Sequence, residues 1–150
     1  TEMQASIGIV QLSKLEKWNI IRNRNAMILY ERLSDLDSIR IPIPREGITH
    51  AWYKFYIYLK LNYIKKSWSK DRIIEVLQSL NLPAYYGSCS EIYLEECIIN
   101  SDSKCNYRLP NARELGQTSL MFLVHPTITV KQMEYYSDRI RFVLKQASIS

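Results

Sequence analysis

Residues 52–61 read WYKFYIYLKL, and this stretch decides the fold because its side chains alternate with the two-residue period of a β-strand. Aromatic side chains of this kind are also enriched in strands. The face expected toward the core carries Tyr53, Phe55, Ile57, Leu59 and Leu61. The other face is amphipathic and carries Trp52, Lys54, Tyr56, Tyr58 and Lys60. The pattern therefore predicts a strand with one buried face.

Helical periodicity, with apolar residues three and four positions apart, marks both ends of the chain. Residues 2–37 lack proline and predict one long helix. Its expected apolar stripe is Leu12, Leu15, Trp18, Ala26, Leu29, Leu33 and Leu36. Near the other end, Thr129 and Gln132 form a capping box that predicts the start of a second helix. Its expected buried face is Met133, Tyr136, Ile140, Val143 and Ala147.

Shorter elements fill the middle of the chain. Ser69 is an expected N-cap for a helix that buries Ile73, Val76, Leu77 and Leu80. Pro110 at a first helical position and Gly116 beyond the end bracket a short helix over residues 111–115. The remaining expectations are an edge strand or loop at 41–44, a short strand in the aromatic and then turn-rich segment 84–90, a short helix over 91–99, a polar loop at 100–106 and a buried strand at 120–124. Together these elements predict an α+β fold in which a small sheet packs against helices, with a long N-terminal helix.

The composition is that of a soluble globular domain. The chain has 150 residues, 47% hydrophobic and 23% charged, with a formal net charge of +5. Its three cysteines, Cys89, Cys97 and Cys105, cannot all pair within one chain and favour a reducing, cytoplasmic location. No apolar run reaches the length of a membrane helix, and no leader pattern opens the chain. Because Thr1 is followed at once by helical sequence, we expect a piece of a longer protein.

Several chemistries are disfavoured by the residues themselves. Four widely separated glycines exclude a phosphate-binding loop, and two histidines with three cysteines lack metal-ligand spacing. The turn at 87–90, Gly-Ser-Cys-Ser, lacks the second glycine of a nucleophile elbow. A catalytic Cys89, or a thiolate pair of Cys89 with His125, stays an open alternative. We expect instead that Cys89 fills space and that His125 ends a strand.

A basic connector is the basis for a second functional class, a non-enzymatic nucleic-acid-binding module. Its cations alternate with aromatic residues that could stack on bases. They are Lys60, Lys65, Lys66, Lys70 and Arg72, with Tyr63 and Trp68 between them. A solvated connector explains the same pattern more simply. The aromatic strand lacks the glycine of the RNA-recognition motif, because Phe55 stands in its place.

Four segments of the chain form a recognisable set: TEMQASIGIVQL (1–12), WYKFYI (52–57), YGSCSEIY (86–93) and RLPNARELGQTSLMFLVHPT (108–127). In this order they resemble the DegT/DnrJ/EryC1/StrS family of pyridoxal-phosphate sugar aminotransferases. The last is the most specific, and the first follows the family pattern except that Ser6 replaces an alanine. Together they cover nearly the whole chain.

The resemblance implies that residues 1–150 are the C-terminal small domain of a fold-type I aminotransferase. The large domain, with the Schiff-base lysine and cofactor contacts, is absent from this chain, and neither Lys14 nor Lys17 is assigned as that lysine. The full-length parent would use pyridoxal phosphate to transfer an amino group, from glutamate, to a nucleotide-linked keto-sugar in polysaccharide or glycan biosynthesis. The isolated chain would be inactive and bind no cofactor.

The implied partners are the chain's own large domain and a second subunit of a homodimer. We expect the large domain to cover Trp18 and the small residues Ala5, Ser6 and Gly8, because small side chains permit close approach. An isolated chain would then expose an apolar patch and self-associate. No membrane contact is expected, and nucleic acid is not the expected partner.

The candidate substrate site is the turn-rich loop at 86–91, whose hydroxyls and backbone groups could bind a sugar or diphosphate. Its predicted substrate-binding residues are Tyr86, Ser88, Ser90 and Glu91. Structural roles compete with this one, because Ser88 and Ser90 could be N-caps and Glu91 could stabilise a helix N-terminus. No catalytic residue and no metal ligand are assigned.

Overall fold

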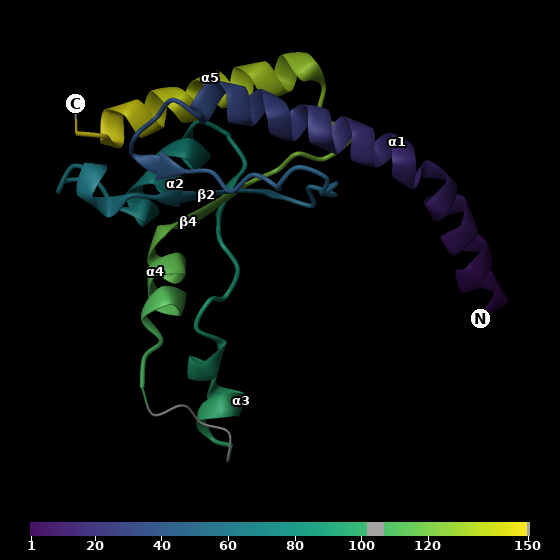
Figure 1. The fold of residues 1–150 in the computed structure, drawn as a ribbon, viewed down its shortest axis with the longest axis horizontal. Helices are drawn as coiled ribbons and strands as arrows, with labels where there is room; N and C mark the ends of the chain where they lie inside the picture. The colour runs from purple at the N-terminus through teal and green to yellow at the C-terminus, as the bar shows by residue number, and fades with distance from the viewer. Residues whose placement is uncertain (102–106, 150) are drawn as a thin grey trace.

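The computed structural model describes residues 1–101 and 107–149, which form a four-stranded antiparallel sheet with helices packed on it. The strands, in the spatial order β1-β2-β4-β3, are β1 (Ile39–Arg40), β2 (Phe55–Leu59), β4 (Ser119–Phe122) and β3 (Ala84–Tyr86). The helices are α1 (Glu2–Leu33), α2 (Lys70–Ser79), α3 (Glu96–Ile99), α4 (Pro110–Thr118) and α5 (Val130–Ala147), with short 3-10 turns η1 (Leu61–Tyr63) and η2 (Ile92–Leu94). The predicted α+β fold, with its small sheet and long N-terminal helix, is confirmed (Figure 1).

Strand β2 has the predicted alternation, since Phe55, Ile57 and Leu59 are all buried. The strand is shorter than the pattern at both ends, so Tyr53 and Leu61 are exposed instead of lying in the core. Both were expected on the buried face, and that part of the prediction is wrong.

Trp52 is a second correction, because it is buried and does not lie on an amphipathic strand face. Its φ of 45° is in the left-handed region, which a bulky residue rarely adopts. Two hydrogen bonds hold it there: its backbone N–H donates to Nδ1 of His50 (2.9 Å) and its indole N–H to Oδ1 of Asn23 (3.1 Å). Its ring also stacks on Phe55, with centroids 5.6 Å apart.

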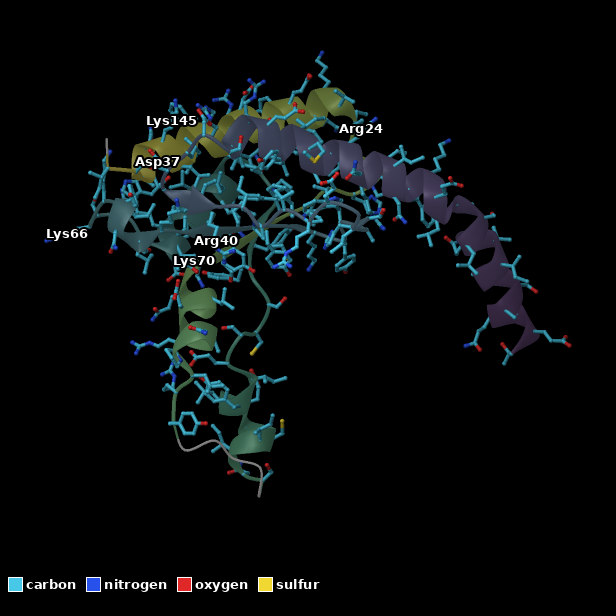
Figure 2. All side chains as sticks on the ribbon, viewed as in Figure 1. Arg24, Asp37, Arg40, Lys66, Lys70 and Lys145 are labelled. Atoms are coloured by element: carbon cyan, nitrogen blue, oxygen red, sulfur yellow. The ribbon has the colours of Figure 1, made fainter. Side chains whose placement is uncertain are left out.

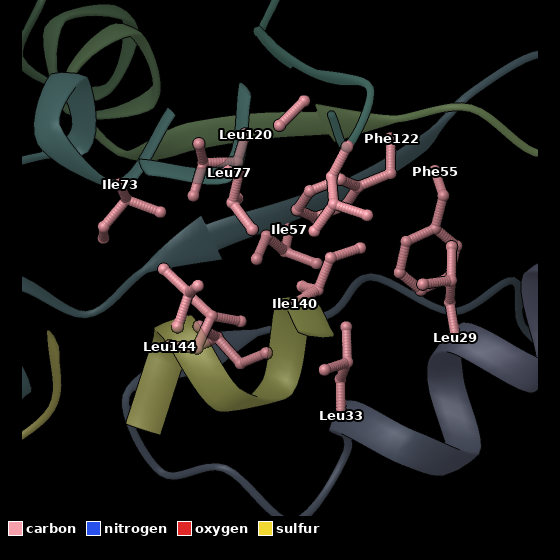
Figure 3. Close-up of a cluster of buried hydrophobic side chains, with 14 of the residues drawn as sticks. Leu29, Leu33, Phe55, Ile57, Ile73, Leu77, Leu120, Phe122, Ile140 and Leu144 are labelled. Atoms are coloured by element: carbon pink, nitrogen blue, oxygen red, sulfur yellow. The ribbon is translucent and has the colours of Figure 1, made fainter. Parts of the chain in front are cut away.

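The register between β2 and β4 determines which of their side chains form the core. Phe55 pairs with Phe122 and Ile57 with Leu120, so the apolar side chains of β2 and β4 lie on the same sheet face. The predicted strand 120–124 is thereby confirmed, with observed bounds Ser119–Phe122. Helices α1, α2 and α5 cover that face, and Figure 3 shows the buried cluster they form with it. Its labelled members are Leu29, Leu33, Phe55, Ile57, Ile73, Leu77, Leu120, Phe122, Ile140 and Leu144.

Helix α1 is confirmed as one long helix, and Thr1 forms a capping box with Gln4. It ends at Leu33 rather than at residue 37. Ala26, Leu29 and Leu33 are buried as expected, whereas Leu12 is 68% exposed, Leu15 is exposed and Trp18 is half-buried. The reason is visible in Figure 1: the N-terminal half of α1 projects beyond the sheet, so its apolar side chains meet no layer of this domain.

The other helices follow their predicted starts more closely than their predicted ends. Ser69 accepts a hydrogen bond from the N–H of Arg72 (3.1 Å), and Thr129 forms its capping box with Gln132. In α2 the buried residues are Ile73, Ile74 and Leu77, while Val76 is half-buried and Leu80 is exposed. In α5 the predicted apolar face is confirmed, with Tyr136 half-buried at its edge.

Gly116 lies inside α4, which continues to Thr118, so its predicted role as a residue beyond the helix is wrong. A Cβ at Gly116 would lie 2.4 Å from Oγ of Ser90, which indicates that the glycine permits close packing. The segment 91–99 divides into η2 and α3, and 41–44 is irregular. Residues 102–106 of the predicted polar loop lie outside the described residues.

Gly87, directly after β3, is packed against the start of β4. A Cβ at this position would lie 2.0 Å from Oγ and 2.6 Å from Cβ of Ser119. The hydroxyl could rotate away, but the Cβ of Ser119 is fixed to the backbone of a central strand. Any side chain at Gly87 therefore forces the two strands apart.

Helices α1 and α5 run side by side in the same direction and are joined by ion pairs. Arg32 Nε lies 2.9 Å from Oδ1 of Asp138, and the two terminal nitrogens of the Arg141 guanidinium, Nη1 and Nη2, donate to the Asp35 carboxylate. These hydrogen bonds and the positive charge of Arg141 lower the pKa of Asp35 from 3.8 to about 2. The pair therefore joins the end of α1 to α5.

The close contact at Gly87 predicts that two glycine substitutions change the free energy of unfolding in different ways. Gly87→Ala should lower the free energy of unfolding by about 1–3 kcal/mol, the usual cost of overpacking. Gly8→Ala, at an open position of α1, should not lower it and should favour helix by up to about 1 kcal/mol. Urea unfolding of both variants measures the difference, and equal effects would contradict the close contact.

The Asp35–Arg141 pair predicts a pH dependence. A carboxylate with a lowered folded-state pKa stabilises the protein above its unfolded pKa, and the stabilisation is lost as the pH falls toward the folded value. Asp35→Asn should therefore lower the urea midpoint at pH 6, and this difference from the wild type should shrink between pH 4 and pH 2. Asp37→Asn is the control, since Asp37 has no ion pair among the described residues. A pH-independent Asp35→Asn effect would exclude this role.

Candidate functional site

The predicted site loop, residues 86–91, leaves the sheet where β3 ends beside β4. Tyr86 is the last residue of β3 and pairs with Leu120, and Gly87 then packs on Ser119. The loop leads down to the lobe that carries η2 and α3, and the chain returns through α4 (Figure 1). The loop is therefore anchored to the sheet at its first residues.

Tyr86 is 51% exposed, and its ring faces a cation. The Lys70 ammonium lies 5.1 Å from the ring centroid and donates a hydrogen bond to the carbonyl of Gly116 (2.5 Å). Partial desolvation, and then the negative charge of Asp71, raise the pKa of Tyr86 above its ordinary value. The phenol is therefore a neutral hydrogen-bonding group at physiological pH, suited to binding and not to proton abstraction.

The two serines of the loop contact different neighbours. Ser88 is exposed, and its Oγ lies 3.0 Å from the phenol oxygen of Tyr56 on β2. Ser90 is half-buried and packs on Gly116 of α4. Neither is an N-cap, because Glu91 and Glu95 occupy the N-cap positions of η2 and α3.

Glu91 makes the strongest polar contacts of the loop, and all are within the chain. Its carboxylate accepts from Nε (2.6 Å) and Nη2 (2.5 Å) of Arg108 and from the Tyr93 hydroxyl (2.6 Å). The Tyr93 hydroxyl in turn accepts from the backbone N–H of Leu109 (2.9 Å). Arg108, and then Tyr93, lower the pKa of Glu91 below its ordinary value. The Glu91 carboxylate therefore links the segment that leads into the lobe to the segment that returns from it.

Cys89 and His125 have separate partners. The Cys89 thiol donates to Oε1 of Glu95 (3.1 Å), and this bond, together with partial burial, raises the pKa of the thiol. A raised pKa disfavours the thiolate that a nucleophile requires. Nδ1 of His125 lies 2.8 Å from Oγ1 of Thr127 in the turn after β4. Cys89 is exposed, so it does not fill space in the core.

The four predicted residues thus share one loop, while their side chains are directed to different neighbours. In the described part of the chain their polar, ring and packing contacts run to α2, β2, α4 and Arg108, and not to one another. Among residues 1–101 and 107–149, no group of three His, Cys, Asp or Glu side chains could hold a metal ion. The loop therefore presents several separate polar groups at one edge of the sheet.

Three residues of this region were not assigned to it from the sequence. Tyr56, Lys70 and Arg108 are 32, 16 and 17 positions from Ser88, Tyr86 and Glu91, respectively. Lys70 was noticed only as part of a basic connector. Because these pairings depend on the sheet and on the lobe, periodicity could not reveal them.

The basic connector does not form one continuous cationic surface. Lys65 and Arg72 donate to the carbonyls of Gln146 (2.8 Å) and Ser67 (2.7 Å), and the Arg72 guanidinium also lies over Trp68. Lys66 projects at one end of the domain, whereas Lys70 lies above α4 (Figure 2). These positions count against a single phosphate-binding track.

Among the described residues, none of the helices is both long enough and apolar enough to span a bilayer. Helix α1 has the length, but charged residues interrupt its apolar side chains.

Comparison with known proteins finds the same fold in an aminotransferase and in dehydratases. An aminotransferase from Psychrobacter cryohalolentis superposes with a TM-score of 0.91 and 36% identity, over 97% of this chain and 39% of that one. The E. coli GDP-4-keto-6-deoxy-D-mannose-3-dehydratase, solved with bound hydrated PLP, superposes with a TM-score of 0.75 and 20% identity, over 95% of this chain and 35% of that one. The dTDP-4-dehydro-2,6-dideoxy-D-glucose 3-dehydratase of Saccharopolyspora spinosa is 23% identical over 98% of this chain and 31% of its own length.

This chain therefore spans between three and four tenths of the length of these relatives. The sequence profile of the DegT/DnrJ/EryC1/StrS aminotransferase family matches residues 1–141, nearly the whole chain. The four segments that resemble this family all lie within the matched residues. The chain belongs to the DegT/DnrJ/EryC1/StrS aminotransferase family.

Proposed function

We propose that this chain is the C-terminal small domain of a pyridoxal-phosphate-dependent aminotransferase that acts on a nucleotide-linked keto-sugar. The observation that carries the proposal is the agreement in both sequence and fold with the Psychrobacter aminotransferase over 97% of this chain. The amino donor is glutamate, the product serves polysaccharide or glycan biosynthesis, and the enzyme is a cytoplasmic homodimer. The unpaired thiols of Cys89 and Cys97 support the cytoplasmic location.

We assign neither Lys14 nor Lys17 as the lysine that holds the cofactor. Both are exposed on the projecting half of α1 in this chain. Pyridoxal phosphate, when bound, supplies the electron sink for amino transfer, and its lysine belongs to the large domain. The small domain contributes binding and positioning.

The loop at 86–91 is the part of this chain that we assign to substrate. Tyr86 presents a neutral phenol and Ser88 an exposed hydroxyl, groups that can donate to and accept from sugar hydroxyls or phosphate oxygens. Gly87, packed on Ser119, keeps the backbone between them rigid. Ser90 and Glu91 complete the assigned set, with Glu91 acting through the shape of the loop that its pair with Arg108 maintains.

Because the cofactor lysine is assigned to the large domain, we predict that the cofactor binds covalently only to the full-length protein. The full-length protein should show the visible absorbance of covalently held pyridoxal phosphate and should aminate a keto-sugar nucleotide with glutamate. Residues 1–150 alone should show neither after gel filtration and borohydride reduction. Absence of the absorbance in the full-length protein would overturn the proposed function, and covalent labelling of the isolated chain would overturn the domain assignment.

The loop assignment predicts a binding defect in the full-length enzyme. Tyr86→Phe and Ser88→Ala should each raise the substrate KM roughly 3- to 10-fold, the effect of one lost neutral hydrogen bond, while the cofactor spectrum stays unchanged. Tyr85→Phe is the matched control for Tyr86→Phe, because Tyr85 is exposed on the same strand and its side chain lies on the sheet face opposite to that of Tyr86. If both site variants turn over substrate like the wild type, the loop has only a structural role.

A further inference from the structure

The middle of α1 carries three cations that share one face of the helix. Lys14, Lys17 and Arg22 belong to no ion pair among residues 1–101 and 107–149. At 3.6 residues per turn their positions fall within about 140° of the helix circumference. Like charges this close on a helix repel one another. An anion bound to this face would relieve that repulsion.

These cations border a cleft of about 480 Å³ between α1 and the turn that follows β4. Trp18, Ile21 and Pro126, all half-buried, line its apolar part. Of the described residues that line the cleft, none is an aspartate or a glutamate. Glu16, the acidic residue of this part of α1, lines a different groove on the opposite flank of the helix. We refer to the space between α1 and the turn as the cationic cleft.

Trp18 gives the cationic cleft an aromatic surface. It lies one helical turn from Lys14 on one side and from Arg22 on the other, because positions four apart are neighbours on a helix. Within the described ranges its indole ring stacks on no other ring and faces no cation of the chain. Exposed indole surfaces of this kind stack on nucleobases. The cleft can therefore hold a flat apolar group beside an anion.

The wall opposite α1 adds a polar group from the turn at 125–127. The backbone N–H of Thr127 donates to Nδ1 of His125 (3.3 Å), so the proton of the neutral imidazole is on Nε2. As far as the structure describes the chain, Nε2 makes no hydrogen bond. The turn therefore contributes a neutral donor to the cleft that the cations of α1 border.

We propose that the cationic cleft binds a phosphate ester that carries a flat apolar group, which is the chemistry of a nucleotide. The phosphate lies among Lys14, Lys17 and Arg22, and the flat group stacks on Trp18. Three cations compensate a doubly charged phosphate monoester, whereas a single carboxylate would leave most of their charge unpaired. Lysine binds phosphate as a point charge and arginine through paired N–H groups. The volume of the cleft is in the range of small-molecule sites.

The cationic cleft is separate from the loop at 86–91. Gly87 of that loop packs on Ser119, the first residue of β4, whereas the turn at 125–127 follows Phe122, its last residue. The two regions therefore lie at opposite ends of β4, and the loop leads to the lobe on the side of the sheet away from α1 (Figure 1). A ligand in the cleft is a second molecule, so the proposal does not depend on the assignment of the loop to substrate.

Equilibrium dialysis of the longer protein against adenosine 5′-monophosphate tests the charge requirement. Lys14→Ala and Lys17→Ala should each weaken binding about tenfold, the effect of one lost charge-assisted hydrogen bond. Lys145→Ala is the matched control, because it removes an equally exposed charge near the far end of α5, and it should leave the affinity unchanged (Figure 2). Equal affinity of all three variants and the wild type would overturn the proposal.

Two further probes separate the phosphate from the flat group. Adenosine lacks the phosphate and ribose 5-phosphate lacks the base, so each should bind about tenfold more weakly than adenosine 5′-monophosphate. If ribose 5-phosphate binds as tightly as the nucleotide, Trp18 contributes no stacking and the proposed ligand class is wrong. If adenosine does, the cations have no role.

Photolabelling locates the bound molecule. The 8-azido derivative of adenosine 5′-monophosphate, irradiated in complex with the longer protein, should label peptides that contain residues 13–22 or 125–127. An excess of unmodified nucleotide should prevent this labelling. Labelling confined to residues 86–91 would assign nucleotide binding to the substrate loop and overturn the proposal. Labelling of residues 1–150 alone, absent from the longer protein, would also overturn it, by showing that a protein surface fills the cleft.

Discussion

The packing of the C-terminal half of α1 against the sheet and against α5 is the contact on which the rest of the structure depends. Leu29 and Leu33 are fully buried against the apolar face of the sheet, beside Ile140 and Leu144 of α5 (Figure 3). Since an α-helix is stiff, anchoring one half of it fixes the direction of the other. The uncovered half therefore projects from the domain at a defined angle (Figure 1).

A buried polar residue makes this packing specific. Asn25 is completely buried, and its amide donates to the carbonyls of His125 (3.1 Å) and Ile128 (3.3 Å) in the connection from β4 to α5. Its own Oδ1 accepts from Arg24 (2.9 Å). A hydrogen-bonded side chain of this kind permits one register of the helix and disfavours the others, because any shift leaves it unpaired. The apolar contacts stabilise the packing of α1 on the sheet, and the hydrogen bonds of Asn25 fix the register of the helix.

Local signals in the sequence predicted the elements well, because their causes are local. The alternation around Phe55 and Ile57 and the capping box at Thr129 depend on residues a few positions apart. The errors have a different cause. Leu12 continues the apolar pattern of α1, but periodicity does not indicate which part of a helix has a partner in the same domain. Gly116 matched a helix exit, yet its role depends on Ser90, 26 positions earlier.

For the candidate site loop at 86–91, too, the sequence could locate the residues but not the contacts that hold them. The family segment 86–93 identified the loop, and its residues are neighbours in the chain. What holds it in shape could not be predicted, because Tyr56, Ser119 and Arg108 are brought to it only by the completed sheet and lobe. Lys70 illustrates the difficulty: its ammonium looked like part of a phosphate-binding connector, but the fold directs it to the Gly116 carbonyl and the Tyr86 ring.

The proposed substrate loop and the projecting half of α1 are held by different means. Gly87 packs on Ser119 and Glu91 pairs with Arg108, so the loop at 86–91 is fixed both to the sheet and to the chain that returns from the lobe. Groups that are already oriented bind a ligand with less loss of conformational entropy. Residues 1–17 of α1, by contrast, are exposed except for the half-buried Gly8. Under the proposed function, a shift of this domain relative to the large domain therefore opens or closes the substrate site while the loop keeps its shape.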